Sequence, residues 1–123
     1  MAINQAMQDA LNEHTNQELY SSYLYLSMSA YCESINLSGF AHWLRIQSEE
    51  EYGHGMKIFD FINDREGRAI LHPIAQPTIE FSSIQDVMQK TLEHERFVST
   101  LINNLYELAV KNNDYATQIH LQW

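Results

Sequence analysis

The stretch QAMQDALNEHTNQELYSSYLYLSMSAYC, residues 5–32, contains neither Gly nor Pro and gives the clearest indication of the fold class. Side chains at alternating spacings of four and three residues share one helical face, which is apolar at both ends and polar in its middle. This face comprises Met7, Leu11, His14, Glu18, Ser21, Tyr25, Met28 and Cys32. The spacing predicts an amphipathic helix over residues 5–32, roughly 42 Å long at 1.5 Å per residue, with Asn4 as a plausible N-cap.

Two further segments, residues 39–65 and 84–111, show the same spacing and predict two more long helices. The first has the face Phe40, Leu44, Gln47, Glu51, His54, Ile58 and Phe61, and the second has Ile84, Met88, Thr91, Glu95, Val98, Ile102, Leu105 and Ala109. Residues 114–123 have the pattern of the first turns of a fourth helix. We therefore predict an all-α fold for the whole chain, residues 1–123, as a single domain.

Residues 66–82 connect the second and third predicted helices and contain Pro73 and Pro77, which disfavour helix. A fully extended connection of this length could reach about 56 Å, which is longer than either helix. We therefore expect a long crossover that traverses a four-helix bundle, so that the third helix starts parallel to the second.

Composition excludes several classes of function. The chain has 7 basic and 16 acidic side chains and a formal net charge of −9, which disfavours nucleic acid and anionic membrane surfaces as partners. No apolar stretch is long enough to span a bilayer. Cys32 is the only cysteine, which excludes a disulfide within the chain and a CxxC motif. A reducing, cytoplasmic location is therefore expected.

Each of the three largely apolar faces is interrupted by an acid, namely Glu18, Glu51 and Glu95. Each acid lies 11 residues after the first residue of its face, close to the midpoint of its helix. Helices packed side by side bring their midpoints to one level, so the three carboxylates should meet inside the bundle. Burying ionised carboxylates costs several kcal/mol each, and no Lys or Arg lies on these faces. A bound cation is therefore expected.

His54 supports this interpretation because it lies three residues after Glu51, where both side chains can reach one ion. Carboxylate oxygen together with imidazole nitrogen suits iron, manganese or zinc. A Glu-x-x-His pair with single Glu residues from other helices makes up most of the di-iron pattern of four-helix bundles. A Glu-x-x-His pair by itself, however, is more often a solvated surface pair.

The other polar residues have simpler explanations. The run Glu49–Glu51 is typical of a solvated face, so composition assigns no role to Glu50. His14 is expected as a packed or partly wet core residue and His94 as a surface residue. Tyr25 is expected to fill the core, with a hydrogen bond to a metal ligand as the alternative.

Five stretches of the chain closely resemble the prokaryotic non-haem ferritins. They are NQELYSSYLY (16–25), QSEEEYGH (47–54), EHE (93–95), DYAT (114–117) and LQW (121–123). The likeness covers the whole chain in order. It implies a ferritin-like four-helix bundle that binds iron, oxidises Fe(II) with dioxygen or peroxide, and stores the ferric mineral in a hollow cage of 24 identical subunits.

The resemblance also implies roles for particular residues. Glu18, Glu51 and His54 would hold one iron of a di-iron centre, and Glu51, as a bridge, and Glu95 would hold the second. Glu50 matches a ligand of an additional third iron site in this family.

Two tyrosines match informative positions of the family. Tyr25 corresponds to a tyrosine beside the centre that is thought to assist electron transfer. Tyr52 stands where haem-binding members carry Met, so no haem is expected.

Members of this family continue well past Trp123, through the rest of the fourth helix and a short fifth helix. The resemblance therefore implies an incomplete iron site in this chain alone and one uncovered groove. The explanations are a truncated product, a second chain that supplies the rest of the fourth helix, and a variant that assembles differently. The alternatives to an iron-storing ferroxidase are a rubrerythrin-like or Dps-type di-iron bundle, and a structural or assembly piece with an incomplete site.

Overall fold

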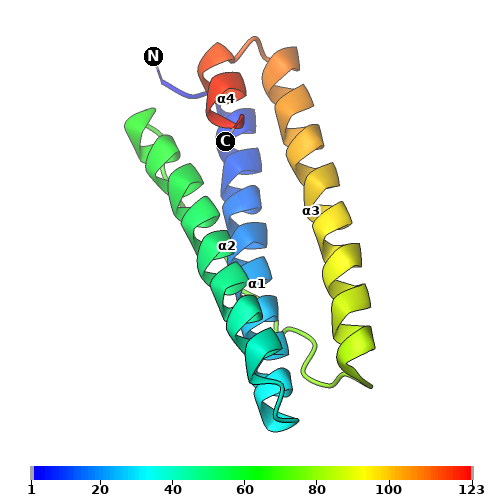
Figure 1. The fold of residues 1–123 in the computed structure, drawn as a ribbon. Coiled ribbons are helices and arrows are strands. Elements are labelled where there is room, and N and C mark those ends of the chain that lie inside the picture. The colour runs from blue at the N-terminus through cyan, green and yellow to red at the C-terminus, as the bar shows by residue number, and fades with distance from the viewer. Residues whose placement is uncertain (1, 123) are drawn as a thin grey trace.

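The computed structural model describes residues 2–122, which form four α-helices and no strand (Figure 1). The helices are α1 (Gln5–Ser34), α2 (Ser38–Asp64), α3 (Ile84–Lys111) and α4 (Tyr115–His120). The predicted all-α class is confirmed, with a short fourth helix. Trp123, the last residue of the predicted fourth helix, lies outside the described residues.

Side-chain caps explain where α1 and α3 begin. The side chain of Asn4 accepts a hydrogen bond from the Met7 amide at 2.8 Å, and that of Ser83 accepts one from the Asp86 amide at 3.1 Å. By contrast, α2 starts one residue earlier than expected, after Leu37, which makes no side-chain cap bond. The helix α1 continues two residues past its expected end, to Ser34.

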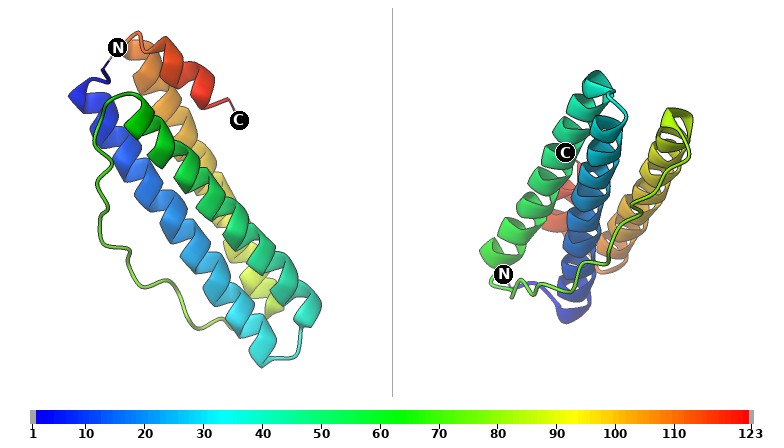
Figure 2. Two further views of the ribbon diagram at one scale, coloured as in Figure 1. Left: turned by 90° about the vertical axis from the view of Figure 1, so that its left-hand side faces the viewer. Right: turned by 90° about the horizontal axis from the view of Figure 1, so that it is seen from below.

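The long connection between α2 and α3 crosses the bundle along the outside of α1, so that α2 and α3 run in the same direction (Figures 1 and 2). Hydrogen bonds attach it to α1 at two levels. Asn12 donates to the Arg68 carbonyl at 2.9 Å and accepts from the Ile70 amide at 2.8 Å. Near the other end, the Ser27 hydroxyl donates to the Thr78 carbonyl at 2.6 Å.

The core consists of two apolar clusters separated by a polar middle layer. One cluster contains Leu24, Tyr25, Met28, Cys32, Ala41, Leu44, Phe81 and Val87. The other contains Met7, Leu11, Ile58, Ile62, Leu105, Ala109 and Leu121. All eight residues of the face predicted on α1 are buried, which places the middle of that face between the two clusters.

The buried face of α2 differs from the predicted one. It comprises Ala41, Leu44, Ser48, Glu51, Gly55, Ile58 and Ile62, whereas Phe40 is 44% exposed. The reason is that α2 packs closely against α1 alone among the long helices. The side of α2 that carries Phe40 faces away from α1, toward an apolar hollow that Trp43 and Met88 also line.

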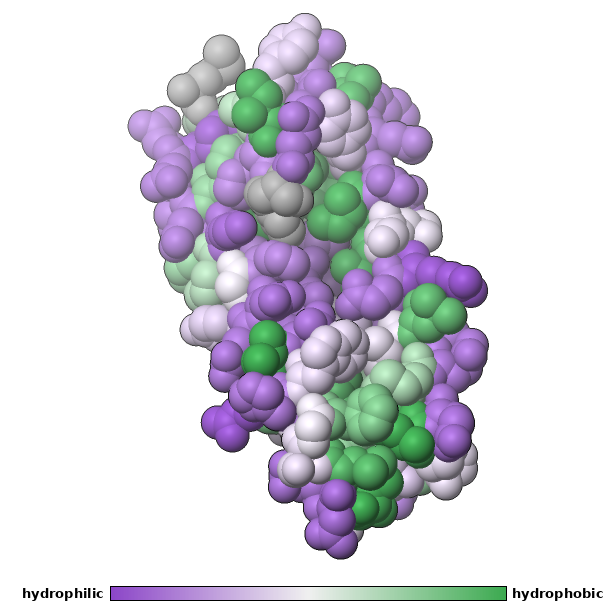
Figure 3. Space-filling model, viewed as in Figure 1, coloured by the Kyte–Doolittle hydropathy of each residue, from purple (hydrophilic) through white to green (hydrophobic). Residues whose placement is uncertain are grey.

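The apolar hollow lies at the end of the bundle where α2 and α3 begin, and apolar side chains gather there on the surface (Figure 3). None of the described helices is both long and apolar enough to cross a membrane.

Candidate metal centre

Three potential ligands meet in the polar middle layer, Glu18 from α1 and Glu51 and His54 from α2. One ligand atom from each lies within 4.8 Å of the others. His54 Nδ1 is 3.4 Å from Glu51 Oε2 and 3.7 Å from Glu18 Oε2. Ligand atoms bound to one ion at about 2.1 Å are separated by roughly 3–4 Å, and both distances from His54 Nδ1 lie in this range.

The two carboxylates are buried without full hydrogen bonding. Glu18 is 1% exposed and Glu51 7%. Among the described residues, neither Glu18 Oε2 nor Glu51 Oε2 has a hydrogen-bond partner. A buried acceptor without a partner costs about 1–3 kcal/mol, and more when charged. A cation between these oxygens would remove that cost, so the residues fit a metal site.

Burial disfavours the negative charges of Glu18 and Glu51, so either a bound proton or a cation would stabilise this layer. Burial raises the pKa of Glu51 to about 8, the adjacent Glu18 carboxyl group adds to the increase, and His54 opposes it. Burial also raises the pKa of Glu18. A divalent cation can therefore replace a proton that the two carboxyl groups otherwise retain.

His14 lies one turn before Glu18 on α1 and is buried, in agreement with the core location expected for it. Its Nε2 is 3.0 Å from Glu18 Oε1. Burial lowers the pKa of His14 to about 4, against a weaker opposing effect of Glu51. The imidazole is therefore neutral at pH 7, and its N–H can donate to the Glu18 carboxylate. The spacing of His14 and Glu18 in the sequence did not predict this contact.

Glu95 lies on α3 and lines the same cavity as Glu18, Glu51 and His54, with a volume of about 210 Å³. Its side chain is exposed and does not belong to the compact group of three. The structure thus brings together three of the four predicted di-iron ligands and leaves Glu95 at the edge of the cavity.

Tyr25 is fully buried, and its hydroxyl donates a short hydrogen bond to Glu95 Oε1. Burial raises the pKa of Tyr25 further above its ordinary value, and the hydrogen bond to Glu95 adds to the increase. The phenol therefore remains a donor at neutral pH. This is the contact that the sequence analysis offered as the alternative to simple core packing.

Glu50, the candidate ligand of a third site, is exposed on α2 and outside the compact group. The expectation that His94 is a surface residue was wrong. The His94 ring is half-buried, and its Nε2 lies 2.7 Å from the Ser21 hydroxyl. Because Ser21 and His94 are both polar, an analysis based on apolar spacing could not detect this link between α1 and α3.

Comparisons with known proteins agree with this geometry. The family model described as Ferritin-like domain matches residues 8–123. Among curated proteins, the bacterial non-heme ferritin of Staphylococcus epidermidis is 46% identical over 114 residues, which cover 93% of this chain and 69% of the relative. That of Staphylococcus saprophyticus is 41% identical, with 98% and 72% covered.

Solved structures show the same fold over nearly the whole chain. An open-pore ferritin from Archaeoglobus fulgidus superposes with a TM-score of 0.97 at 43% identity, covering 99% of this chain and 75% of that one. Chlorobium tepidum ferritin gives a TM-score of 0.95 at 35% identity, covering 98% and 74%. The fold and the carboxylate–histidine centre thus define a ferritin-like helical bundle. The chain belongs to the ferritin family.

Proposed function

We propose that this protein is an iron-storage ferritin subunit and that its buried centre oxidises Fe(II) to Fe(III). One observation carries the proposal: two buried carboxylates from different helices converge with the half-buried His54, and each has an oxygen without a hydrogen-bond partner among the described residues. We take iron as the metal substrate because the similar curated proteins are named bacterial non-heme ferritin.

In this proposal, Glu18 and His54 hold one Fe(II), Glu51 bridges, and Glu95 holds the second Fe(II) from the opposite wall of the cavity. The carboxylates supply negative charge that stabilises Fe(III) more than Fe(II), which favours loss of an electron. Each Fe(II) gives up one electron, and dioxygen or peroxide accepts it. Binding requires a neutral His54 and deprotonated carboxyl groups, so iron uptake should release protons.

Two further residues have supporting roles in the proposal. Tyr25 is buried and donates a hydrogen bond to Glu95, which is a suitable position for assisting electron transfer. Glu50, on the exposed side of α2, would bind a third iron outside the buried layer. Both roles are based on the resemblance to the family.

Storage requires a container, and we propose that identical subunits assemble into a cage, with 24 copies as in the family. The net charge of −9 on each chain would attract cations to the surface of such an assembly. Ferric ions formed at the centre would then accumulate as mineral inside the cage.

The test is aerobic oxidation of Fe(II), followed by ferric absorbance, in the parent and in a Glu51→Ala/His54→Ala variant. The double variant should oxidise Fe(II) at close to the rate of free ferrous ion in the same buffer. Glu49→Gln is the matched control, because Glu49 is an exposed acid on the same helix whose ion pair with Arg45 is on the surface. A double variant that oxidises Fe(II) as fast as the parent would refute the proposed centre.

A further inference from the structure

We propose that His14 is a positioning residue for the metal centre: its imidazole holds one oxygen of Glu18 so that the other oxygen faces the metal. This inference rests on the proposed function, because it assigns Glu18 as a ligand. His14 itself does not bind the metal in this proposal.

The two oxygens of the Glu18 carboxylate have different surroundings. Oε1 lies 3.0 Å from His14 Nε2, whereas Oε2 lies 3.7 Å from His54 Nδ1 and has no hydrogen-bond partner among the described residues. One oxygen is therefore in contact with the imidazole on its own helix, and the other remains available on the side of the centre. A carboxylate held in this way presents a single defined oxygen to an ion.

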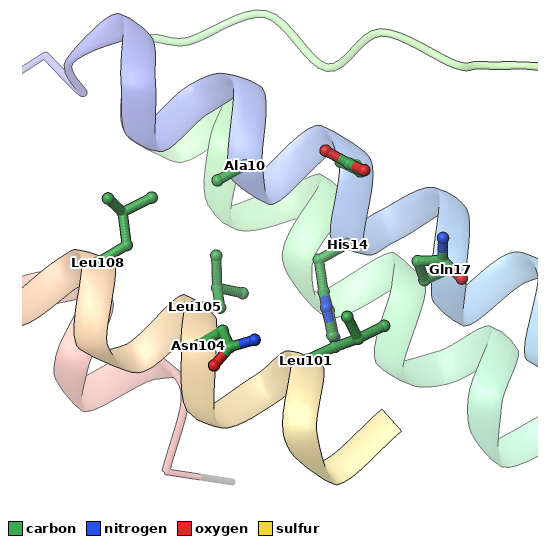
Figure 4. Close-up of a pocket in the computed structure, with 8 residues that line it drawn as sticks. Ala10, His14, Gln17, Leu101, Asn104, Leu105 and Leu108 are labelled. Carbon is green, nitrogen blue, oxygen red and sulfur yellow. The ribbon is translucent and has the colours of Figure 1, made fainter. Parts of the chain in front are cut away.

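The surroundings of His14 restrict its ring. His14 points from α1 toward α3, into a cavity of about 250 Å³ (Figure 4). Besides His14, the cavity is lined by four aliphatic residues and three polar ones, namely Ala10, Leu101, Leu105, Leu108, Glu13, Gln17 and Asn104. The contact that fixes the ring is the one between His14 Nε2 and Glu18 Oε1 at 3.0 Å, and a buried hydrogen bond of this kind is stronger than one in water.

The position of His14 also argues against a role as a ligand. The compact group of donor atoms consists of Glu18, Glu51 and His54 and does not include His14. A parallel contact involves Glu95, which lines the cavity of the metal centre and accepts a hydrogen bond from Tyr25. In this proposal, Glu18 is oriented by His14 and Glu95 by Tyr25. Metal ligands usually have such buried hydrogen-bonding partners.

The test uses anaerobic calorimetric titration of the full chain with Zn(II), a redox-inert probe that needs no turnover. His14→Phe keeps a ring of similar size but removes the donor, and it should weaken Zn(II) binding by about 10-fold to 100-fold. His14→Gln keeps a side-chain N–H donor and should recover most of the affinity. Thr15→Val is the matched control, because Thr15 is equally buried but bonds only to the Leu11 carbonyl, and it should bind Zn(II) as the parent does.

Thermal unfolding of each variant checks that the helices remain folded, and His14→Met, which is flexible and carries no N–H donor, replaces His14→Phe if that variant does not fold. Parent-like Zn(II) affinity in the donor-free variant would overturn the inference. Equal weakening in His14→Gln and His14→Phe would also overturn it, because the donor would not matter. If the parent binds no Zn(II), the proposed centre itself fails, which is a separate result.

Discussion

Two buried residues in and beside the proposed centre have shifted pKa values, and these shifts link the stability of the metal-free protein to pH. Glu51 has a pKa raised by burial to about 8, and His14 has a pKa lowered by burial to about 4. Between pH 4.5 and 8, Glu51 retains a proton in the folded state and loses it when the chain unfolds. Between pH 4 and 6.5, His14 is neutral in the folded state and gains a proton when the chain unfolds. The two residues therefore affect stability in opposite directions.

Because the folded-state pKa of Glu51 is raised, its protonation stabilises the folded state. This contribution to the unfolding free energy has its full value below the ordinary carboxyl pKa of 4.5 and is lost as the pH rises toward 8. For His14, the contribution is complete above the ordinary pKa of 6.5 and is lost as the pH falls toward 4. Between pH 6.5 and 8, the loss from Glu51 is not offset by His14. We expect the unfolding free energy of the metal-free protein to fall across this range.

Denaturant unfolding in the presence of a chelator, at several pH values from 6.5 to 8, measures this slope. Glu51→Gln cannot titrate and should show a distinctly weaker pH dependence than the parent. Glu49→Gln, which changes an exposed acid, should keep the parent slope. Equal slopes in the parent and Glu51→Gln would show that Glu51 does not retain its proton.

At the scale of elements, the crossover depends on its attachment to α1. Asn12 is 4% exposed and makes two hydrogen bonds to the backbone of the crossover, at Arg68 and Ile70. The crossover has no regular secondary structure, so its backbone groups need hydrogen-bond partners from elsewhere. The Asn12 side chain supplies two of them. The position of the crossover, and with it the parallel start of α3, is therefore linked to this residue.

Replacing Asn12 by Ala should lower the unfolding free energy by roughly 2–4 kcal/mol, because both backbone groups lose their partner and a buried cavity forms. Asn16→Ala, one turn later on the same helix, is the control. Asn16 Oδ1 has no hydrogen-bond partner among residues 2–122, so this variant should change stability by less than about 1 kcal/mol. Urea unfolding of both variants checks the difference, and similar losses would contradict the role of Asn12.

The comparison of elements also shows what the sequence could predict. All eight residues of the face predicted on α1 are buried, because α1 contacts both α2 and α3. The spacing missed four further buried residues of α1, which are Asn12, Thr15, Leu24 and Ser29. On α2 the predicted face was rotated, because the actual face depends on which neighbours pack against it. The spacing of apolar residues predicted how far along α3 Glu95 lies. Its distance from Glu51 depends on how closely α3 approaches α2, and the sequence pattern does not determine that approach.

The contacts that orient the ligands were harder to predict than the ligands. Glu18 and His14 are four residues apart, a spacing that permits a hydrogen bond but does not require one. Likewise, the Ser21–His94 link joins two polar side chains from distant parts of the chain. The sequence indicates which residues lie in the polar layer, whereas rotamers and interhelix distance decide which of them touch.

At the scale of the whole molecule, large apolar side chains are exposed on several elements, and contiguous exposed apolar patches mark interaction surfaces. Examples with at least 40% exposure are Tyr23, Leu26, Phe40, Trp43 and Ile79. They come from α1, α2 and the crossover, so several faces of the bundle are involved. Contact with further copies of the chain would cover such faces.

We therefore expect native mass spectrometry to show an assembly whose mass is a multiple of 14.4 kDa, the mass of one chain. The same sample under denaturing conditions should contain a single 14.4 kDa component if the subunits are identical. A second polypeptide in the denatured sample would contradict a homo-oligomer, and a monomer at micromolar concentration would contradict assembly altogether.

The most direct measurement is anomalous diffraction at the iron absorption edge from crystals soaked anaerobically in ferrous salt. We predict an anomalous peak about 2.1 Å from Glu18 Oε2, Glu51 Oε2 and His54 Nδ1, with Glu18 Oε1 still paired with His14. Full-occupancy iron elsewhere in the crystal, with no peak between these three side chains, would contradict the account.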